Sequence, residues 1–72
     1  MVNTRMIKAR MLEEDVSIEV LAEKIGRSAK VAYAKVAGKS AMTLDQAEKI
    51  QEALNIKDAD FAYYFFSHDK TA

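Results

Sequence analysis

Few side chains in this 72-residue chain are of the types that perform catalysis or bind metal ions. It contains no cysteine, which excludes a disulfide framework and any thiolate ligand set. Its one histidine, His68, precedes Asp69 in a C-terminal segment, residues 67–72, that we expect to be frayed, with no rigidly held nucleophile. The acidic run of residues 13–15 is typical of a solvated helix end. We therefore expect no enzymatic activity, no metal, no cofactor and no small-molecule substrate.

The spacing of the basic side chains carries more information. Residues 1–12 contain Arg5, Lys8 and Arg10 without any acid. Residues 24–39 contain five basic residues, again without an acid: Lys24, Arg27, Lys30, Lys35 and Lys39. The net charge of the chain is nevertheless zero, because its acids are concentrated elsewhere. Segregated charges produce local fields even where their sum vanishes. Two interpretations stay open at this point: several ordinary solvated helix faces, or one oriented positive surface.

Short helices must position these side chains, because the chain has no proline and no sustained alternation of apolar and polar residues. We expect five helices, whose N-caps are Asn3 or Thr4, Ser17, Ser28, Thr43 and Asp58. Thr43 and Gln46 have the spacing of a capping box. The apolar residues at helical spacing are Ile7, Met11 and Leu12 in the first helix, then Leu21, Ala22, Ile25, Ala32, Val36, Ala47, Ile50 and Leu54, with Ile56 returning to the core. The fold class predicted is all-α.

Residues 17–37 are predicted to form a helix-turn-helix. Gly26 supplies a residue that tolerates positive φ in the turn, and Gly38 ends the third helix in the same way. Ala22, four residues before Gly26, is small enough for two crossing helices to approach closely. Helical hairpins also occur in many other small domains, so this pattern alone does not define a function.

Length and hydropathy limit the remaining possibilities. A chain of this size forms one domain, residues 1–72, and buries only ~60% of its unfolded surface, so its stability is expected to be marginal unless it pairs. Its apolar runs are too short for a membrane span, and basic residues interrupt the N-terminal segment that a signal peptide would need. We expect a soluble intracellular domain that does not bind membranes.

The segment from Ser17 to Gly38 also carries a resemblance. Residues 17–28 read Ser-Ile-Glu-Val-Leu-Ala-Glu-Lys-Ile-Gly-Arg-Ser, which resembles the helix-turn-helix of the phage repressor and Cro family. Residues 37–44 are similar to the Asn-Gly-Lys-Ser-x-x-Thr loop of small phage regulators, and residues 58–66 resemble their short final helix. The resemblance covers residues 5–66. It implies a lambda-repressor-like fold and a cytoplasmic regulator, in a bacterial host, of a temperate phage's choice between lysogeny and lytic growth.

The resemblance also implies which residues meet a partner. The helix beginning at Ser28 would enter the major groove of operator DNA. Its exposed side chains would be Ala29, Lys30, Val31, Tyr33 and Ala34. Phosphates would lie near Arg27, Lys35 and Lys39, and near the amide end of the second helix at Ser17.

The sequence departs from the family pattern on this same face. Where the family often has glutamine, the chain has Ile18 after the cap of the second helix and Ala29 early in the third. The side chains able to read base edges reduce to Lys30, with Tyr33 as a hydroxyl or methyl contact. Ile18, Val20, Val31 and Tyr33 are either scattered surface hydrophobes or an apolar protein-binding patch. The second interpretation suits an antirepressor, a modulator that binds the cognate phage repressor and blocks its DNA binding.

Five of the six aromatic residues lie between Phe61 and Phe66. Phe61 and Phe65, spaced i, i+4, are expected to close the core. One short helix cannot bury all five, so a homodimer contact through Phe61, Tyr64 and Phe65 is the main alternative.

Overall fold

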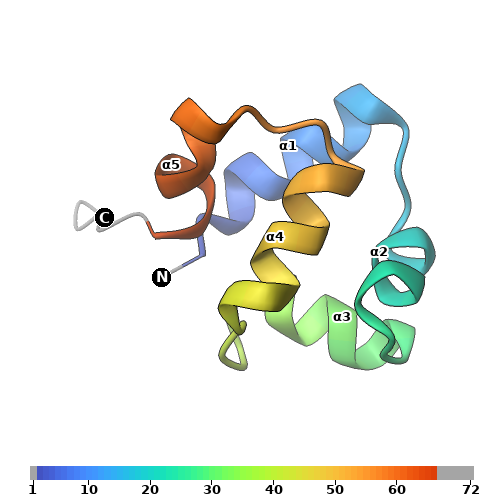
Figure 1. The fold of residues 1–72 in the computed structure, drawn as a ribbon. Coiled ribbons are helices and arrows are strands. Elements are labelled where there is room, and N and C mark those ends of the chain that lie inside the picture. Colours follow the sequence, from blue (N-terminus) through green and yellow to red (C-terminus); the bar gives the residue numbers. More distant parts are fainter. Residues whose placement is uncertain (1, 67–72) are drawn as a thin grey trace.

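The computed structural model describes residues 2–66, and within that range all secondary-structure elements are helices and none is a strand. The α-helices are α1 (Thr4–Glu14), α2 (Ile18–Ile25), α3 (Ala29–Val36), α4 (Leu44–Ala53) and α5 (Phe61–Phe65), with a single 3₁₀ turn, η1 (Asp58–Asp60), before α5. Figure 1 shows α2 and α3 crossing at one end of the molecule, with α4 running from them towards α1 and α5. The prediction of an all-α fold with five helices is confirmed. Met1, His68 and the tail 67–72 lie outside the described residues.

Short polar side chains begin four of these helices, as the sequence predicted. The Asn3 Oδ1 accepts a hydrogen bond from the Met6 amide at 3.1 Å. The hydroxyls of Ser17 and Ser28 do the same for the third amide of α2 and α3. Thr43 and Gln46 bond reciprocally, at 3.1 and 3.0 Å, which completes the capping box of α4. Each cap satisfies a backbone donor that a helix leaves unpaired, which is typically worth ~1 kcal/mol.

A residue in the left-handed backbone conformation follows each of the helices α1 to α4. Gly26 (φ 69°) follows α2 and Gly38 (φ 78°) lies two residues after α3, as predicted. Two non-glycine residues take the same backbone conformation after α1 and α4: Asp15 (φ 56°) and Asn55 (φ 54°). After glycine, aspartate and asparagine are among the residues that adopt this conformation most readily. Asp15 is therefore a structural cap, and the amide of Asp15 donates to Leu12 at 3.2 Å.

The core forms where the inner faces of the helices meet. Ile7, Leu21, Val36, Ile50 and Leu54 are its largest fully buried side chains. They come from α1, α2, α3 and α4 and from the residue directly after α4, so the core joins all the longer elements. Ala22, Ile25, Ala32, Ala47 and Ile56 are also buried, as their spacing predicted.

Arg10 fastens the end of α1 to the end of α4. Its Nε donates to the Leu54 carbonyl and its Nη2 to the Asn55 carbonyl, both at 2.8 Å. The same guanidinium forms ion pairs with Glu13 (3.2 Å) and Glu14 (3.3 Å). The carbonyls at the end of a helix have no partner within it, so Arg10 satisfies groups that the fold would otherwise leave open. The guanidinium charge of Arg10 therefore has its partners within the domain.

Leu12 and Asp58 do not have the places in the fold that the sequence predicted. Leu12 does not face the core: it is 84% exposed. It lies five residues after Ile7, which at ~100° per residue places it about 140° around the helix, whereas Met11 stays on the inner side. Asp58 does not cap a helix through its side chain, since its Oδ1 accepts a hydrogen bond from Gln51 Nε2 at 2.8 Å instead.

Within residues 2–66, every helix is too short or too polar to span a lipid bilayer.

Candidate functional site

The candidate site is the outer surface of α3 together with the turn that presents it. The turn occupies residues 26–28, between the end of α2 and the start of α3. Gly26 takes positive φ there, and the amide of Arg27 donates to the Ala22 carbonyl at 3.0 Å. Arg27 itself is exposed. The two helices pack directly on each other, so α2 supports α3 from behind.

The outer side of α3 presents a mixed chemistry. Lys30 is exposed, Val31 and Tyr33 are 36% and 46% exposed, and Ala34 is half-buried. The helix contains no acidic residue. The prediction that Ala34 is exposed needs correction, because it is half-buried. The same holds for Ala29, which is half-buried and packs against the core. Ala29, Ala32 and Val36 lie at i, i+3 and i+7, the spacing of one helix face, which explains its position.

The second helix contributes less apolar surface than the sequence suggested. Ile18, interpreted as part of an exposed patch, is half-buried and packs against the core. It lies three, four and seven residues before Leu21, Ala22 and Ile25, so it extends their inward stripe. Val20 does remain exposed, at 38%.

The basic residues expected near phosphates differ in whether their charged groups are already hydrogen-bonded within the protein. Lys39 is exposed. The Lys35 Nζ instead donates to the Ala41 carbonyl at 2.6 Å, so its ammonium group is engaged in holding the loop after α3. The hydroxyls of Ser17 and Ser28 accept hydrogen bonds from amides of their own helices. These two serines organise the site by capping.

Sequence reasoning missed one member of this surface, Lys8 of α1. Its Nζ lies 5.5 Å from the centre of the Tyr33 ring, and the Lys39 Nζ lies 6.0 Å from the same centre. The contact exists because α1 packs against α3, with the Thr4 hydroxyl donating to the Val36 carbonyl at 2.8 Å. The two basic windows of the sequence therefore meet at Tyr33. No local pattern links residues 8 and 33, so only the tertiary structure reveals this meeting.

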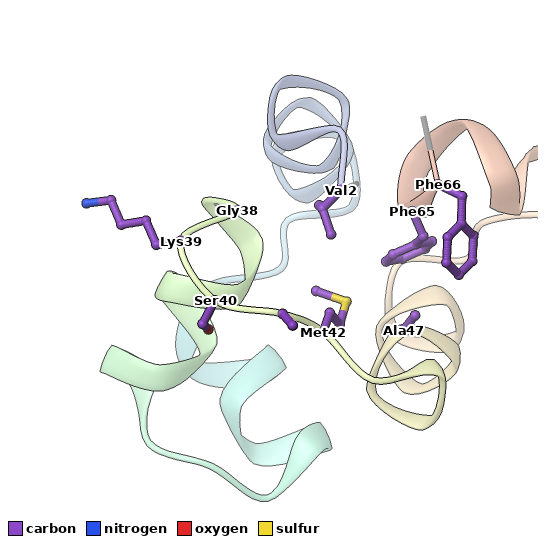
Figure 2. Close-up of a pocket in the computed structure, with 9 residues that line it drawn as sticks. Val2, Gly38, Lys39, Ser40, Met42, Ala47, Phe65 and Phe66 are labelled. Carbon is purple, nitrogen blue, oxygen red and sulfur yellow. The ribbon is translucent and has the colours of Figure 1, made fainter. Parts of the chain in front are cut away.

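Two hollows flank the surface. An open groove of about 480 Å³ lies between the second half of α1 and the start of α2. Its lining includes Lys8, the exposed Leu12, and Val20. A second hollow of about 320 Å³ lies between the loop after α3 and α5 (Figure 2). Apolar side chains of Val2, Met42, Ala47, Phe65 and Phe66 face it, whereas the Lys39 side chain extends away from it.

The aromatic segment belongs mainly to the core. Phe65 is 3% exposed, and Phe61 and Tyr64 are half-buried against the core. The rings of Phe61 and Phe65 are 4.8 Å apart between centres. The burial of Phe65 contradicts its predicted place in a homodimer contact, whereas Phe61 and Tyr64 keep some exposed surface, and a contact through them stays a prediction. The aromatic side chains of this segment that are exposed are Tyr63 (66%) and Phe66 (48%).

Within residues 2–66, no group of three acidic, histidine or cysteine side chains is close enough to hold a metal ion. Comparisons of the chain with protein-family models, with curated proteins and with solved structures gave no match.

Proposed function

We propose that this chain is a small helix-turn-helix regulator of transcription with a lambda-repressor-like fold, of the type that controls a phage's switch between lysogenic and lytic growth. In this proposal α3 enters the major groove of operator DNA, in the manner of Cro. The observation that carries it is the surface of α3, an acid-free helix presented by a short glycine turn and bordered by exposed basic side chains.

Individual roles follow from exposure. Lys30 is the polar side chain of α3 that is free to donate to a base edge, and guanine O6 and N7 are the acceptors that lysine most often meets. Val31 offers an apolar contact suited to the methyl group of thymine. Arg27 and Lys39 are exposed on either side of α3 along the chain and fit phosphate contacts. A helix with one polar base contact is expected to discriminate weakly between sequences.

The test is selection of bound duplexes from a random-sequence pool at low salt, followed by titration of the selected and the scrambled duplex. Preference for the selected sequence is expected in the unaltered protein. Lys30→Ala should reduce that preference by about 5- to 150-fold, the ~1–3 kcal/mol of one specific contact. Lys57→Ala, at an exposed residue between α4 and η1, is the matched control and should leave the preference unchanged. Failure to recover any bound duplex contradicts the proposal.

The groove between α1 and α2 favours a second candidate function. Leu12 and Val20 expose apolar surface on either side of it, and Val31 exposes more on α3. Apolar surface bordered by charge is typical of protein-binding sites. In this alternative the chain is an antirepressor, which uses the helix-turn-helix face to bind the cognate phage repressor and block its DNA binding.

Size exclusion of the chain mixed with that repressor separates the two functions. The antirepressor predicts a co-eluting complex that Val31→Asp weakens and that Lys30→Ala alters less. Absence of a complex contradicts it. Circular dichroism of each variant shows whether the helices persist.

A further inference from the structure

Two ammonium groups from distant parts of the chain flank one exposed aromatic ring. Lys8 comes from α1, Tyr33 from α3 and Lys39 from the loop that follows α3. The distances from the two Nζ atoms to the ring centre are 5.5 and 6.0 Å, within the range of cation–π attraction. We call these three residues the Tyr33 cluster.

The fold holds the Tyr33 cluster in place. The hydrogen bond from Thr4 to Val36 fixes the start of α1 against the end of α3. Gly38, with φ 78°, turns the chain back after α3, and the Lys39 amide then donates to the Ala34 carbonyl at 2.8 Å. The backbone of Lys39 is thereby anchored beside the turn of α3 that carries Tyr33. The cluster thus rests on anchored backbone at each of its three positions.

The positive charge of this cluster has no protein counterpart among residues 2–66. The ion pairs of that range involve Arg10 and Lys49, and none includes Lys8 or Lys39. Two like charges near one ring repel each other, and the ring face offsets only part of that repulsion. An anion with several oxygen atoms that reaches both ammonium groups beside the ring relieves this repulsion and accepts hydrogen bonds from both.

The position of the Tyr33 cluster indicates which anion. Lys30 precedes Tyr33 by three residues, so the two side chains are neighbours on the outer side of α3. The cluster therefore continues the surface proposed to face DNA, and extends it onto α1. When a recognition helix enters the major groove, the elements beside it lie against the sugar–phosphate backbone.

We propose that Lys8, Tyr33 and Lys39 form a clamp for a phosphodiester of the DNA backbone, with the two lysines neutralising phosphate charge and the tyrosine ring keeping their side chains directed to it. This inference rests on the proposed DNA-binding function. It adds α1 to the interface, and it assigns Lys8 a role in positioning the protein on DNA, without any part in reading sequence.

The salt dependence of binding to a random-sequence duplex tests the clamp. Each phosphate that is neutralised contributes ~0.9 to the slope of log affinity against log salt. Because the two lysines share one phosphate, Lys8→Ala and Lys39→Ala should each lower the slope by part of that amount, and the double variant by about the whole of it. Between ~50 and ~200 mM salt, the double variant should therefore lose about 3.5-fold less affinity than the unaltered protein does. Lys8→Arg should keep the slope, and Lys57→Ala is the control for loss of a remote positive charge.

The outcomes are separable. Lowered slopes in Lys8→Ala and Lys39→Ala, with the slope of Lys57→Ala unchanged and the thermal midpoints preserved, support the clamp. If the unaltered protein binds duplex DNA and the slopes of the cluster variants equal its own, the clamp is overturned while DNA binding stands. If the unaltered protein binds no duplex at low salt, both proposals fail. If the cluster variants weaken binding to a phage repressor but have the same salt slope on DNA as the unaltered protein, the clamp is overturned as well.

Discussion

Arg10 provides the sharpest test of how this fold is held together. We expect Arg10→Met to destabilise the domain strongly, because it keeps the aliphatic stem but removes the guanidinium. Two hydrogen bonds from that group, to the carbonyls of Leu54 and Asn55, are lost. A hydrogen bond to a charged group contributes about 1.5–3 kcal/mol. The Arg10 side chain is 25% exposed, so water replaces part of the loss, and we take the lower figure for each bond. The expected loss is about 3 kcal/mol.

That loss is large for a domain of this size. Stabilities of about 0.05–0.15 kcal/mol per residue give this chain roughly 4–11 kcal/mol in total. At about 4–8 °C per kcal/mol, the melting temperature should fall by roughly 12–24 °C. The ion pair with Glu13 adds little, because that carboxylate is exposed and surface pairs are worth ~0–1 kcal/mol.

The assay is thermal and urea unfolding followed by circular dichroism. Arg5→Met is the matched control: Arg5 lies on the same helix and is exposed, so its loss should change stability by no more than ~0.5 kcal/mol. An equally small change for Arg10→Met would show that this residue does not join α1 to α4. Because its charge is engaged internally, Arg10 should also contribute nothing to the salt dependence of DNA binding, provided that the variant is measured below its melting temperature.

Three further predictions concern other parts of the domain. Gly26→Ala should lower the unfolding free energy by about 1–2 kcal/mol, because φ is 69° at this residue while nothing lies within 4 Å of the added carbon. Gly26→Asn should lower it less, since asparagine tolerates positive φ better than alanine. Equal losses for the two variants in urea unfolding would contradict a conformational cause. Phe65→Ala should lower the unfolding free energy by about 3–5 kcal/mol, whereas Tyr63→Ala, at a 66% exposed residue, should change it by no more than ~0.5 kcal/mol. Comparable melting temperatures for the two variants would disprove the assignment of Phe65 to the core. Leu12→Asp should change the melting temperature by no more than a few degrees, since Leu12 is 84% exposed. If the groove between α1 and α2 binds the phage repressor, the same variant should weaken co-elution with it. A large fall in melting temperature would show instead that Leu12 supports the fold.

The sequence predicted the helices well because their ends are locally encoded. Asn3, Ser17, Ser28 and Thr43 each cap the amide three residues further along the chain, and these contacts need no tertiary partner. The inner faces of α2 and α4 follow from i, i+3, i+4 spacing in the same way. Even Ile18 could have been placed correctly, since it extends the spacing of the α2 stripe.

The site was predicted less well because its key contacts join distant residues. Arg10 counted as a free positive charge in the sequence, yet it bonds residues 54 and 55 across the core. Lys35 belonged to the basic window, yet its ammonium group bonds the Ala41 carbonyl. Lys8 was missed because its neighbour Tyr33 lies 25 residues away, and only the packing of α1 on α3 brings them together. Counting charges along a segment therefore overestimates the positive surface in one place and overlooks it in another.

Binding of duplex DNA through the outer side of α3 is the proposal on which the other proposed roles depend. The most direct measurement is the change in backbone amide chemical shifts of isotopically labelled protein as a DNA duplex is added at low salt. We expect shifts concentrated in residues 27–34, with further changes at Lys8 and Lys39 and little effect on η1 or the start of α5. No shifts at saturating duplex, or shifts confined to α4 and α5, would contradict it.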